Sequence, residues 1–184
     1  MYFYVKIVCM KHYLEFRSFY KECISIIKRY QGNFKNLSNT EKIRLIRQNS
    51  NKDLLNSYYN IGKITKEIAT SINSKTTYLK LSTDSMVKNL LEHPEITIKE
   101  YSSIGSYINN AEYILKKNNK NLIYFKIDDK IYQFVIKCTK SGDELFLTTF
   151  HKASAKQLAK DICRYIPIKK DSLDCEDSNY PSVT

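Results

Sequence analysis

The chain has 184 residues, of which 42% are hydrophobic, and this content excludes a wholly disordered polymer. Its length allows one well-buried domain with an appendage, or two small domains. Thirty Lys and Arg against nineteen Asp and Glu give a formal net charge of +11. Together with fifteen Tyr and eight Phe, this charge favours nucleic acid as a partner. A lysine-rich genome, with lysines that only solvate the surface, is the alternative.

The cysteines are odd in number and lack the spacing of metal ligands. They are Cys9, Cys23, Cys138, Cys163 and Cys175, with no CxxC pair among them. This pattern disfavours both a disulfide framework and a zinc site. The sequence therefore predicts no metal and no cofactor, and a reducing location: the cytoplasm, or the cytoplasm of a target cell that receives the protein.

Residues 1–60 are expected to form a helical extension that docks on the rest of the chain or on a partner. The opening MYFYVKIVCM is too short for a membrane span and has no cleavage site, so we expect no membrane insertion, but a short strand or an extension. Apolar spacing then predicts helices over Lys11–Tyr30, Thr40–Arg47 and Asp53–Ser71.

Residues 61–166 are expected to form an α+β domain. The segment Thr76–Leu81 resembles a strand, and Ser82 and Asp84 are suitable caps for the helix that follows. Pro94 ends that helix and leaves His93 at its carboxyl end. A capping-box pattern, TIKE, then starts another short helix at Thr97.

The centre of this domain is predicted to be a four-stranded antiparallel β-meander. Its first strand is expected at Glu112–Lys117, and three more follow within Asn121–Lys152, separated by the turn sequences DDK and KSGD. A closing helix begins at Ser154 and runs through Tyr165 to Pro167. The predicted fold class is thus α+β: amino-terminal helices packed on the meander and closed by a carboxyl-terminal helix. Residues 167–184 are expected to be an acidic, disordered tail.

Polar residues gather at the end of the last predicted strand. If that strand is regular, Leu145, Leu147, Thr149 and His151 share one face and Phe146, Thr148 and Phe150 share the other. On the preceding strand, Lys137 lies among apolar residues, where burial of an unpaired ammonium would be costly. It must reach solvent, pair with Asp143 or Glu144 across the hairpin, or face a site.

This residue set matches the needs of metal-free RNA cleavage. A base removes the proton of the 2′-hydroxyl, a cation stabilises charge on the phosphoryl oxygens, and an acid protonates the leaving 5′-oxygen. His93 and His151 can serve as the acid and base, and lysine and threonine can hold the phosphate. Each residue also has a structural alternative: His93 can stabilise its helix end, His151 can be a solvated loop residue, and the threonines are ordinary strand formers.

Other catalytic motifs are missing from the sequence. No GxxxxGK[ST], GxGxxG, HExxH or GxSxG pattern occurs, so nucleotide-dependent, zinc-peptidase and serine-hydrolase chemistries lack sequence support. Asp128-Asp129 is a turn signal before it is a metal site. Tyr124 and Tyr132 can stack on bases, although core packing explains them at least as well.

An ordered set of four segments resembles the phage-associated nuclease domains of the barnase, EndoU, colicin and RelE superfamily. These segments are IGKITKEIATSI, TYLKLSTDSMVKNLLEHPEI, YFKIDDKIYQFVIKCTK and GDELFLTTFHKAS, which together fall within Gly62–Arg164 or at its edge. The resemblance implies a small α+β, metal-independent RNase of a toxin or phage effector, with RNA as substrate and an immunity or antitoxin protein as a further partner.

The resemblance also implies roles for particular residues. His93 is the general base, His151 the general acid, and Lys137 the phosphate-stabilising cation, although the two histidine roles can be exchanged. Beyond what the resemblance implies, we expect Thr149 and Lys152 to position the phosphate, and Thr148, Tyr124 and Tyr132 to contact the substrate. Lys152 stands where relatives often carry Arg, and lysine keeps the charge but loses the bidentate grip on phosphate.

Two other function classes fit the same sequence. One is a non-catalytic nucleic-acid or ribosome-binding module, and the other is a protein-interaction domain that docks through residues 1–60. Product chemistry separates them, because an RNase yields a 2′,3′-cyclic phosphate in the presence of chelator, whereas a binder shows salt-sensitive affinity without cleavage.

Overall fold

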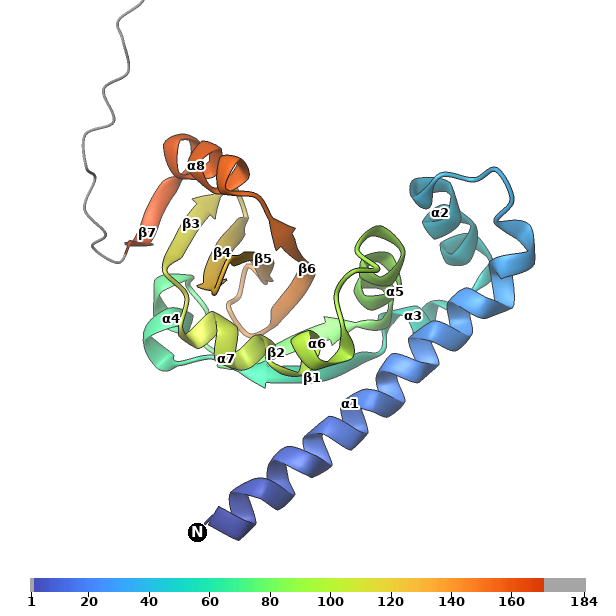
Figure 1. Ribbon diagram of the computed structural model, residues 1–184, viewed down its shortest axis with the longest axis horizontal. Coiled ribbons are helices and arrows are strands. Elements are labelled where there is room, and N and C mark those ends of the chain that lie inside the picture. Colours follow the sequence, from blue (N-terminus) through green and yellow to red (C-terminus); the bar gives the residue numbers. More distant parts are fainter. Residues whose placement is uncertain (1, 171–184) are drawn as a thin grey trace, which may run out of the picture.

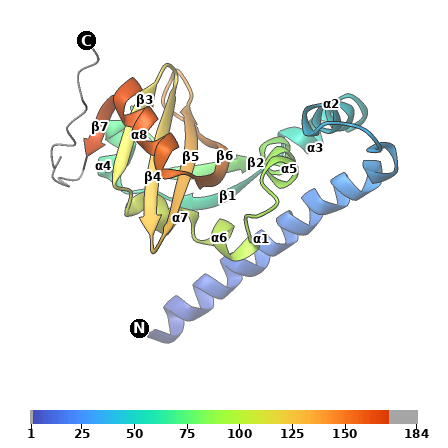
Figure 2. The same ribbon diagram turned by 45° about the horizontal axis from the view of Figure 1, so that its top comes forward.

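The computed structural model describes the backbone of residues 2–170 and the side chains of residues 12–168. The expected acidic tail therefore lies almost wholly outside the described residues. Within them, helices flank one curled sheet, and the long helix α1 (Tyr2–Tyr30) runs along the lower side of the molecule in both views (Figures 1 and 2). No helix in this part of the chain combines the length and the apolarity needed to cross a membrane.

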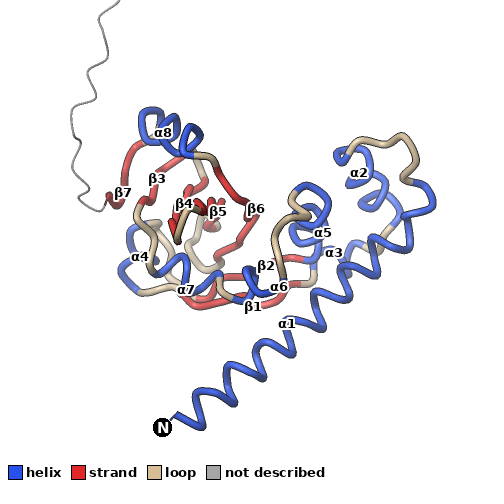
Figure 3. Tube along the Cα trace, in the orientation of Figure 1, coloured by secondary structure: helices blue, strands red, loops and turns tan. Residues whose placement is uncertain are grey.

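The sheet of the described chain has seven strands and is mixed, so the predicted four-stranded antiparallel sheet was incomplete. The strand order is β1-β2-β6-β5-β4-β3-β7, and Figure 3 shows that the strands form one strongly curled sheet. The strands are β1 Tyr58–Lys63, β2 Tyr78–Ser82, β3 Tyr113–Lys117, β4 Lys120–Ile127, β5 Lys130–Cys138, β6 Leu145–Ala153 and β7 Ile166–Lys170.

The predicted meander is confirmed as the antiparallel run β3-β4-β5-β6. Its turns use the residues that the sequence indicated: Asn118 and Asp128 have φ of 53° and 51°, and Gly142 has φ of 81°. Asn, Asp and Gly tolerate this left-handed backbone better than other residues, which is why they fix the hairpins.

The strands β1 and β7 were not predicted. Instead of one helix over Asp53–Ser71, the chain forms a short helix, the strand β1, and a second short helix, because β1 pairs along its length with β2. The strand β7 begins directly after the closing helix and pairs with β3. Pro167 lies within β7, where an edge strand tolerates the missing N–H.

Helices occupy the remaining described chain, together with loops and turns. They are α1 Tyr2–Tyr30, the short 3-10 helix η1 Gln31–Asn33, α2 Asn39–Asn49, α3 Lys52–Asn56, α4 Lys66–Ser71, α5 Thr83–Glu92, α6 Ile98–Ser102, α7 Ile104–Asn109 and α8 Ala155–Arg164. The opening segment is therefore the start of α1 rather than a short strand. The expected caps are present, since the side chains of Ser82, Thr97 and Ser154 accept backbone N–H groups of α5, α6 and α8.

One hydrophobic core joins the amino-terminal helices to the sheet. Phe16 and Ile26 of α1 belong to the same buried cluster as Phe134 of β5 and Phe150 of β6. Helix α1 meets the sheet at β1, where Phe16 and Phe19 pack against Tyr59, whereas α2 packs on α1 and α5. The predicted packing of the amino-terminal helices on the meander is therefore confirmed only in part. A second cluster on the opposite face, around Tyr124, is covered by α8.

Candidate active site

Strand β6 presents different residues to its two faces. Leu145, Leu147 and Phe150 are fully buried in the main core, so they define an inner face. The register of β6 against β5 shifts between Thr149 and Leu147, which makes Thr148 an extra residue in the strand. The predicted regular alternation of side chains along this strand is therefore wrong. The bulge places Phe146 on the outer face, together with Thr149 and His151.

The outer face of β6 lies beside α5. Strand β2 pairs with β6 only at Leu79–Leu145 and Lys80–Phe146, and beyond that point α5 runs next to β6 (Figure 1). His93 caps the carboxyl end of α5, where its backbone N–H donates to the Asn89 carbonyl at 2.7 Å. This geometry holds the His93 ring against the end of β6.

The two histidines of the predicted site lie together. The ring centroids of His93 and His151 are 4.8 Å apart, and the ring planes differ by 18°, which is a stacked arrangement. His93 comes from the end of α5 and His151 from β6, so distant segments of the sequence supply the two rings. Each side chain is partly exposed. Each imidazole therefore keeps some solvent-exposed surface.

Charged and hydroxyl groups surround the pair. The Lys88 ammonium lies 3.3 Å from the Thr149 hydroxyl and 3.6 Å from a Glu92 carboxylate oxygen. On the other side, Nδ1 of His93 is 3.8 Å from a Glu95 carboxylate oxygen. The site thus combines a cation and a hydroxyl with two imidazoles and neighbouring carboxylates.

The electrostatics of the two imidazoles differ. Burial lowers the pKa of both, and at His93 the carboxylates of Glu95 and Glu92 oppose this effect. At His151 the neighbouring His93 lowers the pKa further, as does Lys88 to a smaller extent, while Glu95 and Asp161 raise it. Two imidazolium rings this close repel each other, so the pair is expected to hold one proton more readily than two.

One ring nitrogen of His151 makes no hydrogen bond within the described residues. This atom, Nδ1, is buried. A buried polar atom without a partner is costly, and such atoms are uncommon in folded proteins. Asn89, Tyr101 and Asn121 also carry buried atoms without a partner in this part of the chain, so this feature is not specific to the candidate site.

Lys137 lies on the outer face but apart from the histidines. It is exposed and faces Phe146, whereas Gln133 faces His151. Lys137 is about 14 Å from Gln133 along β5, at roughly 3.4 Å per residue, too far to share one phosphate oxygen with His151. Lys137 also does not form the predicted ion pair across the hairpin, because Asp143 pairs with Lys75 and Glu144 with Lys80.

Lys152 lies on the inner side of β6, away from Thr149 and His151. Its ammonium is 3.4 Å from a Glu100 carboxylate oxygen and donates to the Glu95 carbonyl at 3.3 Å. Burial would raise the pKa of Glu100, but hydrogen bonds from Tyr132 and Thr97, with the charge of Lys152, lower it to about 2. Lys152 therefore ties β6 to the loop after His93 instead of reaching toward a phosphate at the histidine pair.

The remaining predicted contacts are used within the fold. The Thr148 hydroxyl donates to the Val135 carbonyl at 2.9 Å. Tyr124 and Tyr132 are 1% and 2% exposed, and their hydroxyls donate to Asp161 and Glu100. Rings so deeply buried have no free face for a base, so packing is the role that their positions support.

Lys88 was missed by the sequence analysis. Its spacing to Glu92 indicates a helical ion pair, a common surface feature, and nothing in the sequence links it to Thr149. Lys88 and Glu92 also line a hollow of about 450 Å³ between α2 and α5, with Arg44 and Arg47 on its other wall. Arg47 pairs with Asp84 and Lys88 with Glu92, so much of the positive charge around this hollow is compensated.

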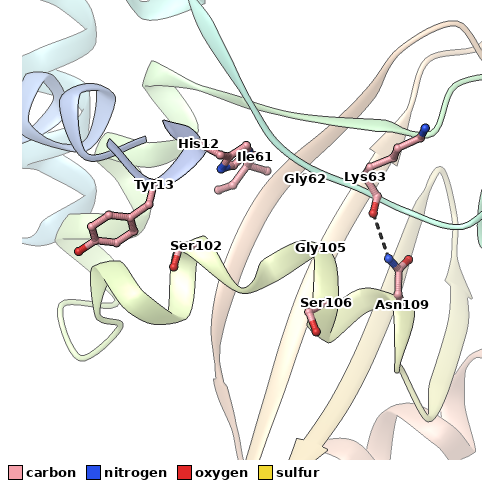
Figure 4. Close-up of a pocket in the computed structure, with 9 residues that line it drawn as sticks. All are labelled: His12, Tyr13, Ile61, Gly62, Lys63, Ser102, Gly105, Ser106 and Asn109. Carbon is pink, nitrogen blue, oxygen red and sulfur yellow. Dashed lines mark hydrogen bonds between the residues drawn. The ribbon is translucent and has the colours of Figure 1, made fainter. Parts of the chain in front are cut away.

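A second hollow, of about 470 Å³, lies away from the histidine pair, between α1, β1, α6 and α7 (Figure 4). Gly62 and Gly105 line it where two backbones meet closely: a Cβ on Gly62 would lie 3.0 Å from the Gly105 Cα. The Asn109 amide donates to the Lys63 carbonyl at its edge, as the figure shows. His12, the third histidine, lines this hollow and is separate from the candidate site.

Comparison with family models, curated proteins and solved structures finds no match for this chain. The side chains of residues 12–168 contain no cluster of three or more His, Cys, Asp or Glu that could hold a metal ion. The fold and site define an α+β protein with a stacked histidine pair beside a lysine and a threonine.

Proposed function

We propose that the protein is a metal-independent endoribonuclease. The observation that carries the proposal is the stack of His93 on His151, with Lys88 and Thr149 beside it. Two imidazoles can serve as acid and base near neutral pH, and an ammonium with a hydroxyl can hold a phosphate. Attack by a 2′-hydroxyl on the adjacent phosphate requires these groups.

In the proposed reaction, a neutral imidazole takes the proton of the 2′-hydroxyl as its oxygen bonds to phosphorus. The bond to the 5′-oxygen breaks, and the other ring, protonated at the start, gives its proton to that oxygen. The products are a 2′,3′-cyclic phosphate and a 5′-hydroxyl. A second transfer of protons through the solvent restores both rings, so no metal or cofactor takes part.

The charges around the rings act on both of them. Glu95 raises and Lys88 lowers the pKa of both imidazoles, while Glu92 raises that of His93 and Asp161 that of His151. The acid and base roles of His93 and His151 therefore stay exchangeable in this proposal. Lys88, which contacts Thr149, takes the role of the phosphate-stabilising cation.

Within this class, we propose that the protein belongs with the phage-associated nuclease domains of the barnase, EndoU, colicin and RelE superfamily. The support is the order of the four similar segments together with the meander and the convergence of His93 and His151. A protein that neutralises such a nuclease would be its natural partner. A shared fold does not by itself establish activity, so the assignment depends on the chemistry of the products.

The test is incubation of RNA with the purified full chain in the presence of excess EDTA. We expect cleavage fragments that end in a 2′,3′-cyclic phosphate, identified by mass spectrometry. Fragments that end in a 3′-hydroxyl, or cleavage that EDTA abolishes, would contradict the proposal. Salt-sensitive binding of intact RNA without cleavage would instead support the non-catalytic binding module.

A further inference from the structure

Rings and lysines follow the outer face of the sheet from β5 to β1, and all of them are exposed except Phe146 and Lys80, which are half-buried. We call them the aromatic–lysine strip, which consists of Lys137, Phe146, Lys80, Tyr58, Tyr78 and Lys63. They come from four neighbouring strands in the order β5, β6, β2 and β1. At about 4.8 Å between strands, the strip spans roughly 14 Å across the sheet.

Strand register connects this strip to the candidate site. Lys137 faces Phe146 across β5 and β6, and Val135 faces Thr149 one step further along the same outer face. On the other side, Lys80 of β2 is aligned with Phe146. The strip therefore begins beside Thr149 and leads away from the histidine pair.

The two tyrosine rings of the strip are exposed, and each has a cation beside it. Tyr58 is 51% exposed, and the Lys80 ammonium lies 4.0 Å from its ring centroid. Tyr78 is 53% exposed, and the Lys63 ammonium lies 5.3 Å from its ring centroid. A cation at this distance holds a ring in place and adds positive charge next to a surface that can stack on a base.

We propose that the aromatic–lysine strip binds single-stranded RNA on one side of the cleaved phosphodiester. Tyr58 and Tyr78 would stack on unpaired bases, and the lysines would meet the phosphates between them. Bases in a duplex are already stacked on one another, so exposed rings select single strands. This inference rests on the proposed ribonuclease function, because it places the strip next to the site of cleavage.

The lysines of the strip differ in how free they are. Lys80 donates to Glu144 at 2.9 Å, and this carboxylate raises the pKa of Lys80, so the ammonium stays charged but part of its charge is compensated. Lys137 has no ion-pair partner within the described part of the chain. We therefore assign Lys137 to the phosphate next to the one that is cleaved.

The test measures binding separately from cleavage. A fluorescent single-stranded oligoribonucleotide that carries 2′-O-methyl groups cannot be cleaved by 2′-hydroxyl attack, and its Kd can be measured by anisotropy. We expect Tyr58→Ala and Tyr78→Ala each to raise this Kd by about 5- to 100-fold, the range for loss of one stacked base. The matched control is Tyr13→Ala, because Tyr13 is also exposed but lies on α1, outside the strip.

The outcomes separate this inference from the proposed function. The strip proposal would be contradicted if the tyrosine variants bound the oligonucleotide as tightly as the wild type. It would also be contradicted if the wild type preferred duplex RNA or did not bind. If the Kd rises as expected but unmodified RNA is never cleaved, the strip stands and the nuclease proposal fails. If RNA is cleaved and the tyrosine variants change nothing, the nuclease proposal stands and the strip fails.

Discussion

The two faces of β6 use their side chains differently. On the inner face, Phe150 stacks on Phe134 with ring centroids 4.8 Å apart, and Lys152 pairs with Glu100. On the outer face, Thr149 and His151 meet Lys88 and His93 and stay partly exposed. The inner polar groups are used by the fold, whereas the outer ones keep capacity for a ligand. One strand thus serves both stability and the candidate chemistry.

The largest expected effect is a loss of stability when the buried inner face of β6 is changed. Phe150→Ala should lower the free energy of unfolding by about 3–5 kcal/mol, because it opens a cavity in a fully buried cluster. Phe146→Ala, on the outer face of the same strand, should cost far less. Urea denaturation measures both, and equal losses would mean that the two faces are not distinct.

Changes to the histidine pair should instead reduce activity and leave stability almost unchanged. His93→Ala and His151→Ala should each reduce RNA cleavage by about a hundredfold or more, the usual cost of losing a general acid or base. Their unfolding midpoints should stay near that of the wild type, because both rings are partly exposed. His12→Ala is the control and should cleave normally. Full activity in either test variant would remove that residue from the mechanism.

Substitution of Lys88 tests which lysine stabilises the charge on the phosphate. Lys88→Ala should lower kcat by about 10- to 100-fold, the value of a hydrogen bond to a charged group, and Lys88→Arg should restore part of the loss. Lys35→Ala, in the exposed loop before α2, is the control. If Lys88→Ala is fully active and Lys137→Ala is not, Lys137 is the catalytic cation, as the family resemblance implied.

Glu100 tests the polar contacts of the inner side. Glu100→Gln should lower the free energy of unfolding by about 1–1.5 kcal/mol at neutral pH, through weaker bonds to Tyr132, Thr97 and Lys152. The folded-state pKa of Glu100 is about 2 and its unfolded value is near 4.5, so its stabilisation is present above that value and declines toward pH 2. Denaturation at several pH values should show the variant and wild type converging in acid.

The smallest expected effect is a pH dependence from the histidine pair. Burial lowers the pKa of His93 and His151, so the unfolded chain binds protons that the folded chain does not. Stability should therefore fall as the pH drops below about 6.5, the ordinary value for histidine. His151→Asn should flatten this slope in denaturation experiments, even though Glu92, Glu95, Lys88 and Asp161 also act on the pair. A slope that is unchanged in the variant would contradict this account.

The sequence by itself determined the features that depend on neighbouring residues. Asn118, Asp128 and Gly142 set the turns of the meander, and Ser82, Thr97 and Ser154 cap their helices as expected. Pro94 placed His93 at the end of a helix. Turns and caps form between residues a few positions apart, so their chemistry can be recognised in the sequence.

The tertiary structure alone decided the features that join distant segments. Strand β1 exists because β2 is available to pair with it, and the bulge at Thr148 turned Phe146 outward against the expected alternation. The stack of His93 on His151 depends on α5 lying beside β6, and so does the contact of Lys88 with Thr149. Such contacts follow from how whole elements pack, and no local pattern records that packing.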